Sequence, residues 1–356
     1  MQQALDLAKK GLNSTSPNPR VGCVITQAEQ VVGEGFHVIA GSAHAEVHAL
    51  RQAGPLATNA TAYVTLEPCS HYGRTPPCAL ALIEAKVKEV IIATLDPNPL
   101  VAGKGKALLT QAGITVKHGL LEESARILNR GFFSRIERNR PFVQLKCATS
   151  LDGKTALNNG QSQWITSEAS RLAVQHLRAK SCAILTGVGT VLKDNPTLNV
   201  RAFHTLRQPK RIVVDTHLRT PLDSHIVQQN GGQTFIATSV LDQTKHQPYL
   251  DQGVQMIKVP LKQNHIDLLF LMEKLADLEI GELMVEAGQT LNSALLQAQL
   301  IDEIVWFQAP KILGSHAQGA FSYQQELTNL ISASQWQITQ VNTIENDICL
   351  YLHPKN

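Results

Sequence analysis

Residues 61–78 read TAYVTLEPCSHYGRTPPC, and this stretch decides how the first part of the chain is expected to fold. Its first six residues, 61–66, favour a β-strand because β-branched and aromatic side chains dominate them. A helix is expected over 78–85, where two prolines stand at the entry, a position that tolerates proline. The strand therefore delivers Cys69 from its carboxyl end, where α/β sheets commonly place ligands, and Cys78 begins the helix.

The triplet His44-Ala45-Glu46 precedes this stretch, and a proline stands directly before each of Cys69 and Cys78. The order H-x-E followed by P-C-x-x-C is a known signature of zinc deaminases, and this chain has the same ligand residues in the same order. One imidazole and two thiolates can hold Zn²⁺ and leave a fourth position for a water, whose pKa the metal lowers toward about 7. Glu46 would then move the proton to the ring and the leaving ammonia. The sequence thus predicts a zinc site of His44, Cys69 and Cys78, with Glu46 as its catalytic acid and base.

Other interpretations of these residues stay open. Taken one at a time, His44 and the two cysteines are typical of ordinary helix and core positions. A closed structural zinc site would need a fourth protein ligand, which His71 could supply. Generic deaminases have two residues between the cysteines, whereas eight separate Cys69 from Cys78 here. We expect this insert to form a loop at the rim of the site, where His71 and Arg74 could contact a ribose phosphate or simply be solvated.

A turn-rich motif, PNPRVG at 17–22, precedes the first expected strand. Asn18 offers both a carbonyl and an amide, which suits recognition of a ring edge or a ribose hydroxyl. Pro-Asn-Pro is also common as an ordinary turn. If the zinc motif is accepted, we expect Asn18 to contact the substrate.

The composition of the 356 residues excludes several classes of protein. A hydrophobic fraction of 43% and a charged fraction of 17% indicate buried cores, and the length favours two domains. The net charge is +3 without a run of like charges, so no nucleic-acid surface is expected. No apolar stretch is long enough to span a membrane or act as a signal peptide. Six cysteines in a chain this long do not suggest disulfides, which favours a cytoplasmic enzyme.

The first part of the chain alternates strands with helices, as is typical of an α/β layered domain. Leu5, Ala8 and Leu12 recur at the spacing of one face of a short first helix. A polar stretch closing with proline, RIERNRP at 135–141, marks the expected domain boundary. The expected strands are 21–26, 30–36, 61–66, 89–94 and 114–117, and the expected helices are 44–53, 78–85, 105–112 and 121–136.

A second alternating series follows, so we expect one domain over 1–140 and another over 141–356. Two final strands, 336–341 and 348–353, indicate an antiparallel finish. The turn Gly187-Val188-Gly189 lacks the third glycine of a dinucleotide fingerprint and is weak evidence of one. The other expected strands are 142–148, 182–186, 211–215, 234–238, 254–259, 283–286 and 303–308, and the expected helices are 168–178, 267–278 and 292–299.

The zinc motif, PCSHYGRTPPC at 68–78 and PNPRVG together closely resemble the deaminase half of the bifunctional riboflavin-biosynthesis deaminase/reductase family. The long loop between the cysteines is itself a match to this family. The second half of the chain resembles the family in order, through SLDGKTA at 150–156, SQWITS at 162–167, LRA at 177–179, TVLKDNPTLNVR at 190–201 and VEAGQTL at 285–291. The resemblance implies a cytidine-deaminase-like three-layer α/β/α domain followed by a dihydrofolate-reductase-like α/β domain, whose cofactor lies across strand ends.

Two consecutive reactions are implied by this resemblance. The first is zinc-dependent hydrolysis of the 2-amino group of 2,5-diamino-6-(5-phosphoribosylamino)pyrimidin-4-one, which releases ammonia. The second is reduction by NADPH of the ribosyl group of 5-amino-6-(5-phosphoribosylamino)uracil to a ribityl chain. The resemblance also implies one Zn²⁺ per chain, a small phosphorylated pyrimidine as substrate, and a cytoplasmic homo-oligomer without nucleic-acid or membrane partners.

Site residues of the reductase half are implied by the same matched positions. Arg178 and Arg201 suit a phosphate, because guanidinium groups bind its oxygens bidentately, and Glu286 could bind ribose hydroxyls. The helix entry at Gly288 could cradle a pyrophosphate. The proton donor stays open between Lys146, Asp194 and a water. The residues expected at the cofactor are Ala148, Trp164, Thr190, Asp194, Thr216, Gly288, Gln289, Thr290, Leu291, Asn292, Ser293 and Ala294. Those expected at the substrate are Ser162, Arg178, Leu198, Arg201 and Glu286, with Asn18 in the deaminase half.

Several of these residues also have structural interpretations. Trp164 and Leu198 could be packing residues, and Arg178 could complement a helix dipole. Thr190 and Asp194 could cap a helix or form a turn. Without the resemblance, packing would be about as well supported as ligand binding for Trp164 and Leu198.

Three alternative functions remain to be distinguished. A nucleoside or base deaminase with a non-catalytic, ligand-binding second domain would not oxidise NADPH with the deaminated intermediate. A nucleic-acid-editing deaminase would need a basic, aromatic-lined groove, and only 5% of this chain is aromatic. A scaffold protein derived from a decayed enzyme would not need the complete ligand set and Glu46.

Overall fold

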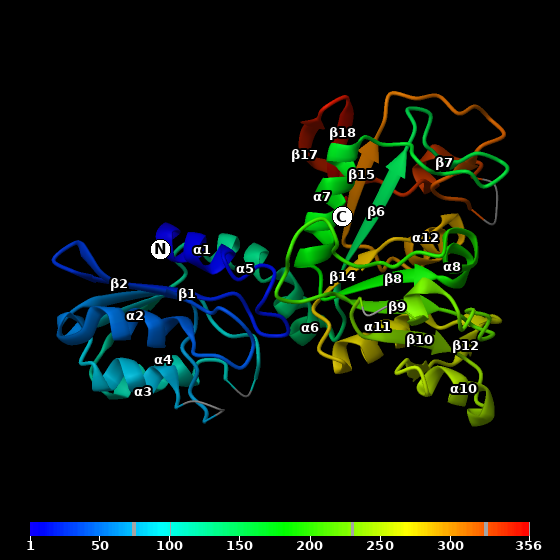
Figure 1. Ribbon diagram of the computed structural model, residues 1–356. Helices are drawn as coiled ribbons and strands as arrows, with labels where there is room; N and C mark the ends of the chain where they lie inside the picture. The colour runs from blue at the N-terminus through cyan, green and yellow to red at the C-terminus, as the bar shows by residue number, and fades with distance from the viewer. Residues whose placement is uncertain (73–75, 100, 229–230, 324–326, 356) are drawn as a thin grey trace. The chain divides into compact units, whose positions relative to one another are not determined.

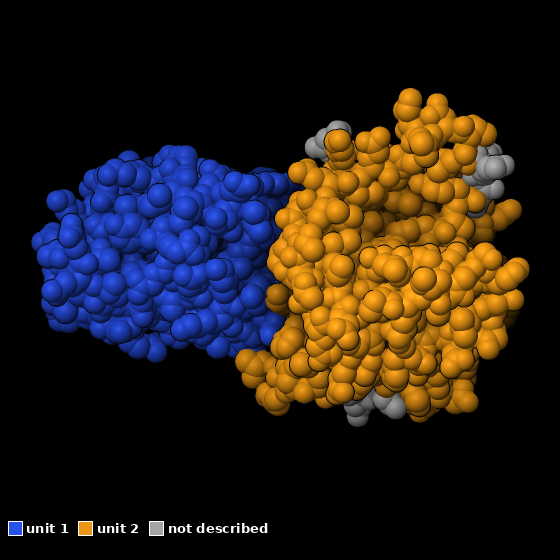
Figure 2. All heavy atoms as spheres, turned by 90° about the horizontal axis from the view of Figure 1, so that it is seen from above, with its two compact units in different colours: residues 1–139 blue, residues 140–356 orange. Residues whose placement is uncertain are grey.

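The computed structural model describes residues 1–72, 76–99, 101–228, 231–323 and 327–355. The chain divides into two compact units, residues 1–139 and 140–356, which have different colours in Figure 2. Within the described residues, no helix has both the length and the apolar character needed to cross a bilayer.

Unit 1 is a mixed five-stranded sheet between two layers of helices (Figure 1). The strand order is β2-β1-β3-β4-β5, with β1 antiparallel to both of its neighbours and β3, β4 and β5 parallel. Helices α1 and α5 cover one face, and α2, α3 and α4 cover the other (Figure 1). The bounds are α1 Gln2–Lys9, β1 Gly22–Gln27, β2 Gln30–Phe36, α2 Ala45–Ala53, the 3-10 turn Gly54–Ala57, β3 Thr61–Leu66, α3 Cys78–Glu84, β4 Glu89–Thr94, α4 Lys104–Gln111, β5 Thr115–His118, α5 Glu122–Leu128 and α6 Arg130–Arg138.

Helix α2 lies unusually close to the sheet, and two glycines of β2 allow this approach. A Cβ atom on Gly33 would come within 2.2 Å of the Ala49 carbonyl oxygen, and one on Gly35 within 2.3 Å of the Ala45 carbonyl oxygen. No other residue type fits at such distances. The close packing fixes the start of α2, where His44 is the N-cap residue.

The first expected helix is shorter than its apolar pattern suggests. Helix α1 ends at Lys9, and Leu12 lies in the following turns, so the assignment of Leu12 to the helix face was wrong. The reason is local: the amide groups of Lys10, Gly11 and Leu12 make only short-range turn bonds, which tighten the chain after the helix.

The single helix expected over 121–136 is also wrong, because the chain breaks there into α5 and α6. The break is at Asn129, which is 1% exposed and has a φ of −111°. Its side-chain oxygen accepts a bond from the Arg20 amide at 2.7 Å, and its side-chain nitrogen donates to the Arg20 carbonyl at 2.9 Å. This pairing with a segment 109 residues away holds Asn129 out of helical geometry.

The polar stretch 135–141, expected to be the domain boundary, is partly helical. Helix α6 continues to Arg138, and Asn139 ends it in the left-handed conformation with a φ of 51°. The change of unit falls directly afterwards, between Asn139 and Arg140.

Unit 2 is built on a nine-stranded sheet in the order β11-β10-β9-β8-β14-β6-β15-β18-β17. The seven strands from β11 to β15 are parallel, and β18 and β17 add an antiparallel finish, as expected. The strand bounds are β6 Phe142–Thr149, β7 Lys154–Ala156, β8 Ala183–Gly187, β9 Lys210–Val214, β10 Thr234–Thr238, β11 Gln255–Lys258, β12 Leu261–Lys262, β13 His265–Ile266, β14 Glu282–Val285, β15 Glu303–Gln308, β16 Gln318–Gly319, β17 Trp336–Ile344 and β18 Asp347–Pro354.

Helices pack on both faces of this sheet. Within β8, Leu185 belongs to one buried cluster with helices α11 and α12, and the adjacent Ile184 belongs to another with α7. Strands buried on both faces are typical of parallel sheets. The helix bounds are α7 Glu168–Lys180, α8 Val188–Asp194, α9 His225–Gln228, α10 Gln243–Leu250, α11 Leu268–Asp277, α12 Gln289–Gln297 and a 3-10 turn Leu330–Ser332. The two expected α/β architectures are therefore confirmed.

Candidate functional site

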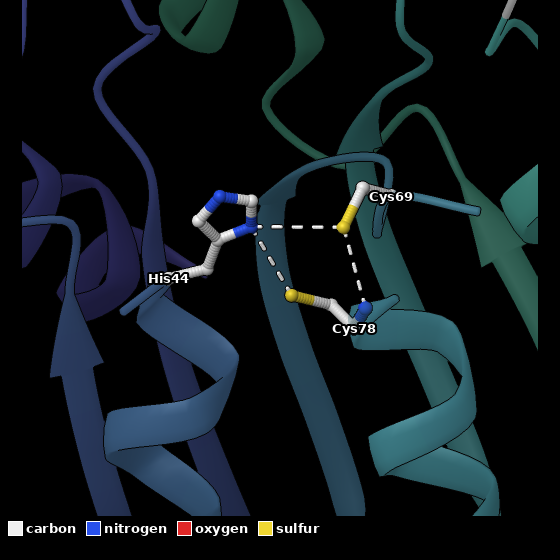
Figure 3. A group of neighbouring side chains, drawn as sticks. All are labelled: His44, Cys69 and Cys78. Atoms are coloured by element: carbon white, nitrogen blue, oxygen red, sulfur yellow. Dashed lines mark hydrogen bonds between the residues drawn. The ribbon is translucent and has the colours of Figure 1, made fainter. Parts of the chain in front are cut away.

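Three potential metal ligands meet in unit 1, each from a different element (Figure 3). His44 caps helix α2, Cys69 lies on the loop after β3, and Cys78 is the first residue of α3. The His44 Nδ1 atom lies 3.2 Å from Cys78 Sγ and 3.6 Å from Cys69 Sγ. The three ligand atoms all lie within 4.8 Å of one another. The predicted zinc ligands are thus brought together.

The charge state of Cys69 favours metal binding. Hydrogen bonds from the Cys78 thiol, from His44 and from the Cys78 amide at 3.3 Å lower the pKa of Cys69 to about 4, although burial opposes the shift. The hydrogen bond to Cys69 also raises the pKa of His44. A thiolate is the form of cysteine that binds metals, so this sulfur is prepared to act as a ligand.

Glu46 is buried beside these ligands, with 3% of its surface exposed. Burial, followed by the charge of Cys69, raises its pKa to about 7. Its Oε2 atom has no hydrogen-bond partner among the described residues. The carboxyl group also has a hydrogen bond with the Cys78 side chain, so only one of its oxygens is without a partner in the part of the chain that the structure describes. A buried carboxyl group with a pKa raised toward neutrality can both accept and donate a proton, as the sequence prediction requires.

The donor set fits a catalytic zinc ion. Tetrahedral zinc with one nitrogen and two sulfur ligands places the ligand atoms roughly 3.5 to 3.8 Å apart, close to the distances found here. Three protein ligands leave one position for water or substrate. His71 is exposed and is not among the three grouped ligands, so a fourth ligand from this histidine has no support. Arg74 lies outside the described residues.

His37, which was not predicted as a site residue from the sequence, connects Asn18 to the metal ligands. His37 is 3% exposed, its Nε2 atom lies 3.1 Å from Asn18 Nδ2, and its Nδ1 atom lies 3.2 Å from the Ala43 carbonyl. Its ring meets the ring of His44 edge to face, with 5.4 Å between the ring centres. Asn18 therefore reaches the zinc group through His37. The signal in the sequence was a histidine directly after the strand residues Gly35 and Phe36.

A buried carboxylate, Glu67, holds the loop that carries Cys69. Glu67, two residues before Cys69, accepts hydrogen bonds from the amides of Asp96, Gly103 and Lys106 at 3.0 to 3.2 Å. These bonds fasten the start of α4 to the loop that carries Cys69. No local pattern in the sequence indicates this role, because the hydrogen-bond partners follow Glu67 by 29 to 39 residues.

Unit 2, orange in Figure 2, contains a cavity of about 1440 Å³ at the carboxyl ends of the parallel strands. Every residue that the sequence predicted for the reductase half lines this cavity. They are Ala148, Ser162, Trp164, Arg178, Thr190, Asp194, Leu198, Arg201, Thr216, Glu286 and the run from Gly288 to Ala294. Residues from 148 to 294 thus converge on one place.

Glu286 and Arg178 form a buried ion pair in this cavity. Arg178 Nε donates to Glu286 Oε1 at 2.6 Å, and Arg178 Nη2 donates to Oε2 at 3.0 Å. Burial alone would raise the pKa of Glu286, but the charges of Arg178 and Lys146 outweigh it and lower the pKa to about 2. Arg178 Nη1 also donates to the Asn199 carbonyl, so all three guanidinium nitrogens have partners. The structure therefore leaves less of Arg178 for a phosphate than the sequence suggested, and Arg201 is the more accessible arginine.

The cavity is suited to a phosphorylated cofactor. Its described lining residues include six lysines and arginines but only two carboxylates, Asp194 and Glu286. Gly288 is the exposed N-cap of α12, a nine-residue helix whose first amides are available to a phosphate. The Oδ1 atom of Asn292, which also lines the cavity, is buried without a hydrogen-bond partner among the described residues. The residues present thus fit a dinucleotide such as NADPH.

Comparisons with protein families cover both units. Residues 1–94 match the family described as cytidine and deoxycytidylate deaminase zinc-binding region, and residues 141–350 match the RibD C-terminal domain. The chain is 47% identical over 364 residues to riboflavin biosynthesis protein RibD of Escherichia coli K12, covering 99% of this chain and 98% of that protein. It is 44% identical over 367 residues to RibD of Haemophilus influenzae, covering 100% and 96%.

Two solved structures superpose on nearly the full length of this chain. A structure of Acinetobacter baumannii RibD superposes with a TM-score of 0.91 at 45% identity, covering 99% of this chain and 97% of that one. A Thermotoga maritima diaminohydroxyphosphoribosylaminopyrimidine deaminase/5-amino-6-(5-phosphoribosylamino)uracil reductase superposes with a TM-score of 0.88 at 32% identity, covering 100% and 97%. The match to the zinc-binding deaminase region supports zinc, and the match to the RibD C-terminal domain supports NADPH, as the two expected cofactors. The chain therefore belongs to the RibD family of bifunctional riboflavin-biosynthesis enzymes, with a zinc-dependent deaminase and a reductase in one polypeptide.

Proposed function

We propose that this chain carries out the two reactions named for its Thermotoga maritima relative, in that order. It hydrolyses the 2-amino group of 2,5-diamino-6-(5-phosphoribosylamino)pyrimidin-4-one to release ammonia. It then reduces the ribosyl group of 5-amino-6-(5-phosphoribosylamino)uracil to a ribityl chain. The observation that carries the proposal is the three-ligand zinc group beside the buried Glu46, whose Oε2 atom has no hydrogen-bond partner among the described residues.

In the deaminase site, His44, Cys69 and Cys78 hold zinc, which supplies an activated water at neutral pH when bound. Glu46 transfers the two protons of that water, one to the ring nitrogen and one to the amino group, which leaves as ammonia. Burial raises the pKa of Glu46, which suits the carboxyl group to both transfers. Asn18, oriented by His37, recognises the edge of the substrate.

In the reductase site, Arg178 orients Glu286, whose carboxylate binds ribose hydroxyls of the substrate. Arg201, which is exposed in the cavity, binds the substrate phosphate, and Ser162 and Leu198 complete this end. The remaining cavity residues bind NADPH. They are Ala148, Trp164, Thr190, Asp194, Thr216 and Gly288 to Ala294, with the pyrophosphate at the start of α12.

Each of the two proposed activities belongs to one part of the chain. Residues 1–140 carry the deaminase and residues 141–356 the reductase, which the separate family matches support. We further propose that the enzyme acts in the cytoplasm as a homo-oligomer, without nucleic-acid or membrane partners. The net charge of only +3 supports the proposal that nucleic acid is not a partner.

A coupled assay tests the proposal. The zinc-loaded chain is given the diaminopyrimidine ribotide, first without and then with NADPH. Ammonia should appear in both cases, and NADPH oxidation should begin only once deaminated product has formed. Ammonia release without NADPH oxidation, even with purified deaminated intermediate, would instead favour a deaminase with a non-catalytic second unit.

A further inference from the structure

The cofactor-binding residues of unit 2 lie in a row across the sheet. Ala148 is in β6, Gly288 follows β14, Thr190 follows β8, and Thr216 follows β9. These four strands are parallel and adjacent in the order β6-β14-β8-β9 (Figure 1). Three strand spacings amount to roughly 14 Å. A cofactor that contacts all four residues must therefore lie across the strand ends.

The position of the substrate determines which end of the cofactor lies at which end of this row of strands. Glu286 directly follows β14, and Lys146 of β6 lies 3.9 Å from its carboxylate. The ring that delivers hydride must lie beside the substrate, at the β6 end of the row. The adenosine half of the cofactor then reaches the ends of β8 and β9.

Two further cavity residues follow the end of β9, namely His217 and Arg219. Both are exposed, and among the described residues neither has a carboxylate as an ion-pair partner. Of the other cavity arginines, Arg178 pairs with Glu286, and Arg171 lies over the Trp164 ring at 4.6 Å. The fourth, Arg201, is assigned above to the substrate phosphate. Arg219 is thus an available cation in the cavity wall.

The turn that carries Arg219 is held firmly. The carboxylate of Asp215, which is fully buried, accepts bonds from the Thr220 amide at 2.7 Å and the Thr220 hydroxyl at 2.8 Å. The Tyr249 hydroxyl donates to the Thr220 carbonyl at 2.6 Å. The Asp215 carboxylate is therefore directed into the turn, and Arg219, just before Thr220, lines the cavity.

We propose that Arg219, assisted by His217, binds the 2′-phosphate of NADPH and makes the reductase prefer NADPH over NADH. This inference rests on the proposed assignment of the cavity to the cofactor. The 2′-phosphate is the only group that distinguishes the two cofactors, and it lies on the adenosine ribose, at the β9 end of the row. A guanidinium group binds such a phosphate through parallel hydrogen bonds, which a neutral ribose hydroxyl cannot replace.

Binding measurements on the full, zinc-loaded chain test this directly. Dissociation constants are measured by calorimetry for NADPH, NADH, 2′,5′-ADP and 5′-AMP, with wild type, Arg219→Ala, Arg219→Lys and the control Lys258→Ala. Lys258 is an exposed cation of unit 2 outside the cavity. Melting curves establish that each variant is folded.

Arg219→Ala should weaken the binding of NADPH and of 2′,5′-ADP about 10- to 100-fold, the range expected for lost hydrogen bonds to a charged group. Binding of NADH and 5′-AMP should stay within about 2-fold, because neither has the 2′-phosphate. Arg219→Lys should be intermediate, and Lys258→Ala should match wild type. An unchanged ratio of NADPH to NADH affinity in folded Arg219→Ala would overturn this inference alone. Failure of the wild type to bind either dinucleotide would overturn the cofactor assignment as well.

Discussion

Replacing Glu286 with glutamine should destabilise unit 2 and alter its response to acid. The carboxylate is 11% exposed and accepts two charged hydrogen bonds from Arg178, with Lys146 3.9 Å away. A glutamine could still accept the bond from Arg178 Nε. Its amide group would point donors at the donors of Arg178 Nη2, and two buried cations would lose their counter-charge.

The size of the effect follows from the pKa of Glu286. Its value of about 2 in the folded chain compares with an ordinary value of 4.5. At 1.36 kcal/mol for each pKa unit, the difference corresponds to about 3 kcal/mol of folding free energy at pH 7. Because the folded pKa is depressed, this stabilisation is complete above pH 4.5 and is lost as the pH falls toward 2.

Urea unfolding followed by tryptophan fluorescence measures the free energy of unfolding of unit 2 alone. All three tryptophans, Trp164, Trp306 and Trp336, belong to that unit. We expect Glu286→Gln to lose about 3 kcal/mol at pH 7 and to show a smaller decline than wild type between pH 6 and pH 3. The matched control is Glu279→Gln, since Glu279 is an exposed carboxylate of the same unit.

Two results would refute this reasoning. One is a variant as stable as wild type at pH 7, which would mean that the pair contributes nothing beyond its desolvation cost. The other is an equal loss of stability with acid in both proteins, which would place the responsible carboxylates elsewhere.

Two further predictions concern the zinc group. Chelation of zinc should abolish ammonia release while reduction of the deaminated intermediate by NADPH continues; parallel loss of both activities would contradict the assignment of separate sites. A Cβ atom on Gly105 would come within 2.0 Å of the Pro68 carbonyl oxygen, so Gly105→Ala should displace the segment carrying Cys69, cost about 1–3 kcal/mol and lower the zinc content. Metal analysis with melting curves checks this against Lys104→Ala, an exposed position on the same helix, and full zinc occupancy with unchanged melting would disprove it.

Much of the fold could be predicted because its signals are local. Strand β3 occupies the expected residues 61–66, and α3 begins at Cys78 as expected. Apolar patterning and proline positions act over short segments, and the whole zinc motif lies between His44 and Cys78. The convergence of His44, Cys69 and Cys78 was likewise predictable, because their chemistry requires a shared metal.

The features that sequence reasoning missed depend on distant partners. The helix break at Asn129 exists because its side chain bonds the backbone of Arg20. The pairing of Arg178 with Glu286 joins residues 108 positions apart, which no local pattern reports. His37 resembles an ordinary residue after a strand until the fold places it against the ring of His44.

The central claim is that a zinc ion held by one imidazole and two sulfurs works with a carboxyl group that does not bind the metal. Zinc content and ammonia release should therefore be measured together on purified Glu46→Gln. We predict one zinc per chain, unchanged reductase activity and ammonia release reduced by at least about 100-fold, as expected when a general acid and base is removed. Ammonia release at the wild-type rate, or loss of zinc from the variant, would contradict the account.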